Sequence, residues 1–79
     1  TWKDKYMNIE SQKMENVMFM LSKRYHTEIR IEGEELKAEI FSGRFDIDQS
    51  LENIFETIDL ITPIHYQQQP DGTYLVTPK

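Results

Sequence analysis

Apolar residues between positions 11 and 25 recur with the period of an α-helix. The later ones stand three, four, seven and eleven positions after the first, so they share one stripe. These residues are Met14, Val17, Met18, Leu21 and Tyr25. The hydroxyl of Ser11 can accept a hydrogen bond from an unpaired N–H of the first turn, and we expect Ser11 to be the N-cap. The pattern therefore predicts an amphipathic helix over 11–25.

A second helical stripe follows later in the chain. Its residues are Leu51, Ile54, Phe55, Ile58 and Ile61. We expect Asp48 to cap its N-terminus, and Pro63 stands just past its end, where a helix cannot continue.

The two helices look like copies of one unit. The segments SQKMENVM (11–18) and DQSLENIF (48–55) share Gln, Glu and Asn at a constant offset, 48 − 11 = 37. A chance match over eight positions is the alternative, but both segments fall at a helix start. Strand-like runs flank each helix, at Lys5–Ile9 and Thr27–Glu32 for the first, and at Ala38–Ile47 and Ile64–Gln68 for the second. The chain therefore reads as two strand–helix–strand units.

The chain ends in a hairpin. The turn sequence PDG at 70–72 is followed by a strand over Thr73–Thr77. Glu32–Glu35, with Gly33, is expected to be a charged loop that joins the two units. The predicted fold class is α+β, with two β-α-β units plus the C-terminal hairpin and two helices packed against small mixed sheets. We expect a single domain over 1–79 that is a fragment of a longer protein, since the chain begins with Thr1.

A glycine interrupts the apolar face of the strand that precedes the second helix. Phe41, Phe45 and Ile47 alternate along this face, and Gly43 stands among them. A missing side chain lets a helix, or a bend in the strand, approach the backbone closely. We expect Gly43 to serve packing of this kind, between the two phenyl rings; the alternative is that it makes room for a ligand.

Two apolar residues of the first helix lie off its stripe. Phe19 is on nearly the opposite side, and Met20 lies between. A helix that is apolar on two sides is either enclosed between layers or presents a patch to a partner. We expect the enclosed arrangement, with a contact patch at Phe19 and Met20 as the alternative.

Composition removes several function classes. The chain has 79 residues, a net charge of −5 and a pI near 4.9, with no basic stripe for a phosphate backbone, so no nucleic-acid partner is expected. It has no cysteine, which excludes disulfides and thiolate metal sites. No apolar run reaches the length of a bilayer span. A domain this small has little interior from which to form a deep catalytic cavity.

Candidate chemistry is sparse. His26 and Glu28 could hold one side of a metal ion, but a site needs three or four ligands. DIDQSLEN resembles a calcium loop, yet Leu51 and Thr57 occupy the positions that require glycine and a bidentate glutamate. His65 and the serines form no catalytic motif. We expect no enzymatic activity, metal, cofactor or small-molecule substrate.

Several short motifs, in this order and spacing, resemble the C-terminal domain of FecR-like anti-sigma factors. The markers are Trp2 and Lys3 at the entry, the helical stripe from Met14 to Tyr25, Phe41-x-Gly43-x-Phe45, Ser50-Leu51-Glu52, and Thr62-Pro63-Ile64. The family usually has a glycine near Lys5, an aromatic residue in place of Arg24 and a threonine in place of Ile61. None of these departures removes a core position.

This resemblance implies a fold similar to the secretin and TonB short N-terminal domain, in which small sheets enclose the helices. It also implies a periplasmic, membrane-anchored signal-relay domain. Its partner would be the signalling domain of a TonB-dependent outer-membrane transporter, and an unseen cytoplasmic part would hold an extracytoplasmic-function sigma factor. The alternative with the same fold is the N-terminal signalling domain of a transporter itself, or a secretin-type assembly module.

Two surfaces are candidates for the partner contact. The strand at 73–77 has a mild face, made by Thr73, Leu75 and Thr77, without the charges that guard an idle sheet edge. We expect a partner strand to pair with this edge. The rival contact is the patch at Phe19 and Met20.

Overall fold

The computed structural model describes residues 6–46 and 48–79. Within them the elements are β1 (Tyr6–Lys13), α1 (Met14–Tyr25), β2 (Ile29–Ile31), α2 (Glu34–Ala38), β3 (Ile40–Asp46), α3 (Leu51–Ile61), β4 (Ile64–Gln68) and β5 (Tyr74–Pro78). This order confirms the predicted α+β class, with one short helix added. The predictions that involve Trp2, Lys3, Lys5 and Ile47 lie outside the described residues.

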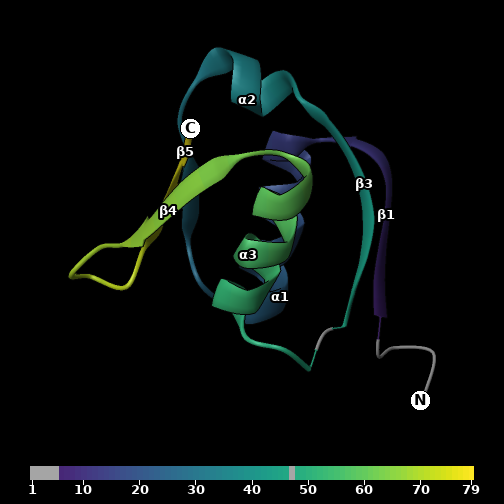
Figure 1. Ribbon diagram of the computed structural model, residues 1–79. Coiled ribbons are helices and arrows are strands. Elements are labelled where there is room, and N and C mark those ends of the chain that lie inside the picture. Colours follow the sequence, from purple (N-terminus) through teal and green to yellow (C-terminus); the bar gives the residue numbers. More distant parts are fainter. Residues whose placement is uncertain (1–5, 47) are drawn as a thin grey trace.

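The strands form two small sheets. β1 and β3 pair antiparallel, and β5 lies between β2 and β4 in a three-stranded sheet. β2 runs parallel to β5, whereas β4 runs antiparallel to it, so the second sheet is mixed. In Figure 1 the two sheets stand on opposite sides of the two long helices. The fold therefore packs its helices against small mixed sheets, as the sequence predicts.

One apolar core joins the helices and both sheets. α1 and α3 each bury four residues, and the two sets differ by the same offset of 37. The pairs are Met14 and Leu51, Val17 and Ile54, Met18 and Phe55, and Leu21 and Ile58. Ile61, predicted as the fifth residue of the second stripe, is 58% exposed, so that prediction is wrong at the last residue of α3. Ile9 of β1, Phe41 and Phe45 of β3, and Ile64, Tyr74 and Val76 of the other sheet complete most of the cluster. The duplicated sequence thus corresponds to a duplicated pattern of burial.

The start of α1 differs from the prediction. Ser11 is not an N-cap but a bulged residue of β1, with φ of 49° and its N–H donating to Ser42 Oγ at 2.9 Å. β1 continues directly into α1, and the Lys13 side chain makes no capping bond. The N–H of Met14 donates instead to the carbonyl of Glu39 at 2.8 Å. A backbone acceptor from another segment thus pairs with the first of the free N–H groups at the start of α1.

The start of α3 also differs. Ser50, not Asp48, is the N-cap, and its Oγ accepts from the N–H of Asn53 at 3.2 Å. The N–H of Asp48 donates to Asp46 Oδ1 at 2.9 Å, which places Asp48 in the turn before the helix. Asp and Ser are both common N-cap residues, so residue type does not distinguish them. The turn before α3 places Ser50, and not Asp48, at the N-cap position.

The gap at Gly43 is filled by the side chain of a neighbour on the same strand. A Cβ at Gly43 would lie 3.1 and 3.2 Å from two ring carbons of Phe41. The rings of Phe41 and Phe45 are parallel within 2°, with centroids 5.8 Å apart. Gly43 therefore serves packing, but the group that approaches its backbone is the ring of Phe41 rather than a helix.

The loop predicted at Glu32–Glu35 overlaps α2. Gly33 adopts φ of 96° before this helix, a conformation that L side chains rarely reach. The single turn of helix then buries Leu36, which is 4% exposed. One apolar residue among charged ones gives no periodicity, and for that reason the sequence pattern did not predict α2.

The C-terminal hairpin forms as predicted, with β4 at its predicted bounds and a turn at 70–72. Asp71 Oδ1 accepts from the N–H of Thr73 at 3.0 Å, and Gly72 adopts φ of 95°. β5 is nevertheless the central strand of its sheet. The expectation that it offers a free edge is wrong, because parallel pairing with β2 occupies that edge.

Candidate interaction surfaces

The residues predicted from the last strand lie on the outer face of the three-stranded sheet. Thr73, Leu75 and Thr77 are half-buried, and they alternate along β5 with the buried Tyr74 and Val76. Since β2 and β4 pair with both edges of β5, a partner strand cannot add to it. A partner could contact these residues only through their side chains.

This outer face is polar and carries both charges. Leu75 is paired with Arg30 of β2 and with Gln67 of β4. Arg30 Nε lies 3.5 Å from Glu28 Oε2, and both side chains are well exposed. Such an exposed pair contributes little to stability, and the mixture of charges indicates no particular partner.

Phe19 is exposed on α1. The described chain leaves 61% of this residue accessible, so the expectation that the helix is covered on both faces is wrong at this position. Met20 is half-buried and packs against the core. The structure therefore places a large apolar side chain on the surface with a supported apolar neighbour beside it.

An open groove of about 510 Å³ runs beside Phe19. Its lining comes from α1, the residue after α1, and the start of β1, and comprises Met7, Phe19, Met20, Lys23, Arg24 and His26. Lys23 Nζ lies 5.3 Å from the centroid of the Phe19 ring, within range of a cation–π contact. We call this set of six residues the α1 groove. Half of them are apolar, and the other half are basic or can become so.

The basic residues of the α1 groove follow from the local fold. Lys23 and Arg24 stand in the last turn of α1, where positive charge interacts favourably with the helix dipole. His26 ends the helix in a left-handed conformation, with φ of 53°. These residues were not predicted from the sequence, although Lys23 follows Phe19 at the i+4 spacing that brings helical side chains together.

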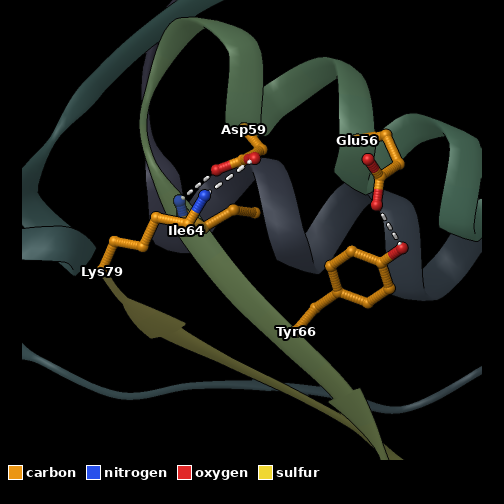
Figure 2. A network of polar contacts seen from close by, with 5 residues as sticks. All are labelled: Glu56, Asp59, Ile64, Tyr66 and Lys79. Carbon is orange, nitrogen blue, oxygen red and sulfur yellow. Dashed lines mark hydrogen bonds and ion pairs between the residues drawn. The ribbon is translucent and has the colours of Figure 1, made fainter.

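A different arrangement covers the outer side of α3, where carboxylates bond to the neighbouring strands. Figure 2 shows the hydroxyl of Tyr66 donating to Glu56 Oε2 at 2.6 Å. It also shows Asp59 accepting from the N–H of Ile64 at 2.9 Å and from Lys79 Nζ at 3.2 Å. The hydroxyl of Tyr74 donates to Glu52 in the same way. These contacts fasten α3 to β4 and β5.

The hydrogen bonds perturb the acidity of their partners. The bond to Glu56 raises the pKa of Tyr66 to about 12, and the bond to Glu52 does the same for Tyr74. In return, the hydroxyl of Tyr74 lowers the pKa of Glu52. The N–H of Ile64, followed by Lys79, lowers the pKa of Asp59. At neutral pH both tyrosines are neutral donors, and Glu52 and Asp59 are charged acceptors, the state that holds the helix.

The two histidines lie on different elements. His26 follows α1, and His65 is an exposed residue of β4, opposite Thr77. Over residues 6–46 and 48–79, no three His, Asp or Glu side chains gather as a metal site. In the same residues, no helix has the length and apolar character needed to cross a membrane.

A family model gives the decisive comparison. The model for the C-terminal region of FecR matches residues 6–76, most of the chain. The chain belongs to the FecR C-terminal family. The resemblance inferred from the short motifs is thereby confirmed, and the match reaches from the first residue of β1 to Val76 of β5.

Solved structures agree on the fold of this FecR C-terminal domain. Crystal structures at 1.65 and 2.50 Å resolution of a candidate anti-sigma factor from Parabacteroides distasonis each superpose with a TM-score of 0.84 at 19% identity. They cover 99% of this chain, which spans only 36% of theirs. No curated protein matches the chain significantly.

Proposed function

We propose that this domain is the periplasmic protein-interaction and signal-relay module of a FecR-like anti-sigma factor. The observation that carries the proposal is the family match over residues 6–76. The candidate anti-sigma factor of the same fold supports it. In this role the domain regulates an extracytoplasmic-function sigma factor that a separate, cytoplasmic part of the longer, membrane-anchored protein holds.

The partner in the periplasm is the signalling domain of a TonB-dependent outer-membrane transporter. A relay of this kind needs a stable scaffold with an accessible contact surface, and the filled core and the exposed Phe19 meet both needs. The module acts without enzymatic chemistry, because the perturbed tyrosines and carboxylates of α3 are occupied in holding the fold.

Two surfaces compete for the contact. Phe19 and Met20 on α1 are the first, since large exposed apolar side chains concentrate binding energy. Thr73, Leu75 and Thr77 on the outer sheet face are the second, now as a side-chain surface rather than an edge.

Titration of isotope-labelled protein with transporter signalling domains from the same genome tests the partner. We expect one of them to give saturable shifts in the NMR spectrum, centred on one of the two surfaces. In cells, a reporter for the sigma factor should lose its response to the inducer when Phe19 is replaced by Glu in the full-length protein, if α1 is the contact. Leu60→Glu, at an exposed position of α3, is the matched control. Absence of binding to every signalling domain, with a normal reporter response after deletion of 6–79, would refute the proposal.

A further inference from the structure

We propose that the α1 groove binds an acidic segment of the partner protein that carries one large apolar side chain. This inference rests on the proposed function, and it adds the chemistry of the partner. The apolar side chain would lie against Phe19 and Met20, and a carboxylate beside it would meet Lys23.

The apolar half of the groove is suited to a single anchoring side chain. Phe19 is 61% exposed, while Met7 and Met20 are half-buried beside it and pack against the core. Methionine side chains are flexible and polarisable, so they adapt to an inserted apolar group. A volume of about 510 Å³ holds a short segment rather than a whole folded face.

The charged half of the groove determines which charge the bound segment should carry. The protein has a net charge of −5, yet none of the described residues that line this groove is acidic. Lys23, Arg24 and His26 are all exposed at one end of α1. A local basic area on an acidic protein favours a compact acidic segment. A long polyanion or an anionic membrane would extend beyond this area, onto a protein whose net charge is −5.

Lys23 links the two halves. Its ammonium group lies 5.3 Å from the centre of the Phe19 ring, which keeps the cation beside the apolar surface before a partner arrives. A carboxylate placed one turn of helix from an apolar anchor would reach Lys23 while the anchor touches Phe19. Such preorganisation lowers the conformational cost of binding.

Selection from a random library of displayed short peptides tests this chemistry directly, because it does not require the partner protein. Wild-type protein should enrich peptides that combine Asp or Glu with Phe, Leu or Trp. A representative peptide should bind Phe19→Ser at least about tenfold more weakly and Lys23→Glu about fivefold more weakly. Leu60→Ser and Lys13→Glu, which make the same chemical changes at exposed positions of α3 and β1, should bind as the wild type does. Raising the ionic strength to about 1 M should weaken binding further.

Several outcomes would overturn the inference. These are enrichment of peptides without an acidic bias, no enrichment at all, or equal binding by Phe19→Ser and the wild type. Binding of phosphatidylglycerol vesicles in preference to acidic peptides would assign the groove to a membrane instead.

Binding experiments can refute the proposed groove without refuting the proposed function, and the reverse. If a transporter signalling domain binds the protein and Phe19→Ser leaves that affinity unchanged, the groove is wrong and the relay stands. If Phe19-dependent acidic peptides are selected but no signalling domain binds, the groove stands and the proposed partner is wrong.

Discussion

The two long helices bury the same positions and differ on their outer sides. On α3, Glu56 accepts a hydrogen bond from Tyr66 of the next strand. The corresponding position on α1, 56 − 37 = 19, is the exposed Phe19. Likewise Asp59 binds the N–H of Ile64, whereas its counterpart Ser22 bonds back to the carbonyl of Phe19 within its own helix. One copy uses these positions to bind its own sheet, and the other leaves an apolar side chain exposed.

This difference separates stability from recognition within a duplicated fold. Both copies must keep the buried stripe, because each stripe forms part of one core. The outer positions are under no such requirement. The copy whose outer carboxylates are occupied by its own strands has fewer polar groups left for a partner, although it also exposes Leu60 and Ile61.

The largest change in stability is expected in the core, where it tests whether the two copies contribute equally. Leu21 and Ile58 are corresponding residues, and both are fully buried. Leu21→Ala and Ile58→Ala should each destabilise the domain by about 2–5 kcal/mol, as much as a domain of this size has to lose. Urea unfolding followed by circular dichroism should give a single transition at a lower midpoint in both variants. Leu60→Ala, on the exposed side of α3, is the control. Two separate transitions would show that the copies fold independently.

A smaller effect should distinguish the two helix starts. Ser50→Ala removes the side-chain cap of α3 and should cost about 1 kcal/mol. Lys13→Ala, at the N-cap of α1, should change stability by less than about 0.5 kcal/mol, because the Lys13 side chain makes no capping bond. Urea midpoints of the two variants measure the difference. Equal losses would mean that the Lys13 side chain stabilises the start of α1 as Ser50 stabilises that of α3.

The same contrast explains which features the sequence could predict. The buried stripes were predictable because apolar spacing fixes the inward face of a helix whatever lies around it. The caps were not, because Ser11 and Asp48 are suitable by type, and the choice depended on a bulge in β1 and a turn at Asp46. The position of β5 at the centre of its sheet could not be predicted from the sequence either. Its mild outer face resembles an edge strand, and only the parallel pairing with β2 shows otherwise.

The residues of the α1 groove were predictable in part. Phe19 and Met20 were identified from their position off the helical stripe, whereas the basic neighbours were not. Met7 comes from β1, the strand directly before α1, so its place in the groove depends on how β1 packs beside α1. The i+4 spacing from Phe19 could have identified Lys23. A lysine at the end of a helix is common, however, and does not by itself indicate a binding site.

The polar contacts of α3 should make stability depend on pH. The folded-state pKa of Glu52 is lowered by the hydroxyl of Tyr74, so this contact stabilises the fold above pH 4.5 and is lost as the pH falls below it. Tyr74→Phe should cost about 0.5–1.5 kcal/mol at pH 7 and make the acid-induced loss less steep. Thermal melts from pH 7 down to about 3 measure both effects. If Tyr74→Phe loses stability with falling pH as steeply as the wild type does, the bond from Tyr74 does not lower the pKa of Glu52.

The alkaline side gives an independent check with the opposite sign. The pKa of Tyr74 is raised from 10.0 to about 12, so its contact with Glu52 is intact below pH 10 and is lost as the pH rises toward 12. Tyr66 should behave in the same way through Glu56. Spectrophotometric titration should therefore show that some of the tyrosine ionises well above pH 10. Tyr74→Phe should reduce that part of the signal.

The smallest expected effect on stability concerns the residue that should matter most for binding. Phe19→Ser should change the free energy of unfolding by less than about 0.5 kcal/mol, because the phenyl ring buries little in the domain itself. The matched change on the other helix, Glu56→Ser, removes the bond to Tyr66 and should cost about 0.5–1.5 kcal/mol. Urea denaturation of both variants, beside their affinity for an acidic peptide, separates the two roles. A loss above about 1 kcal/mol in Phe19→Ser would place Phe19 with the core and remove the reason for regarding α1 as the open helix.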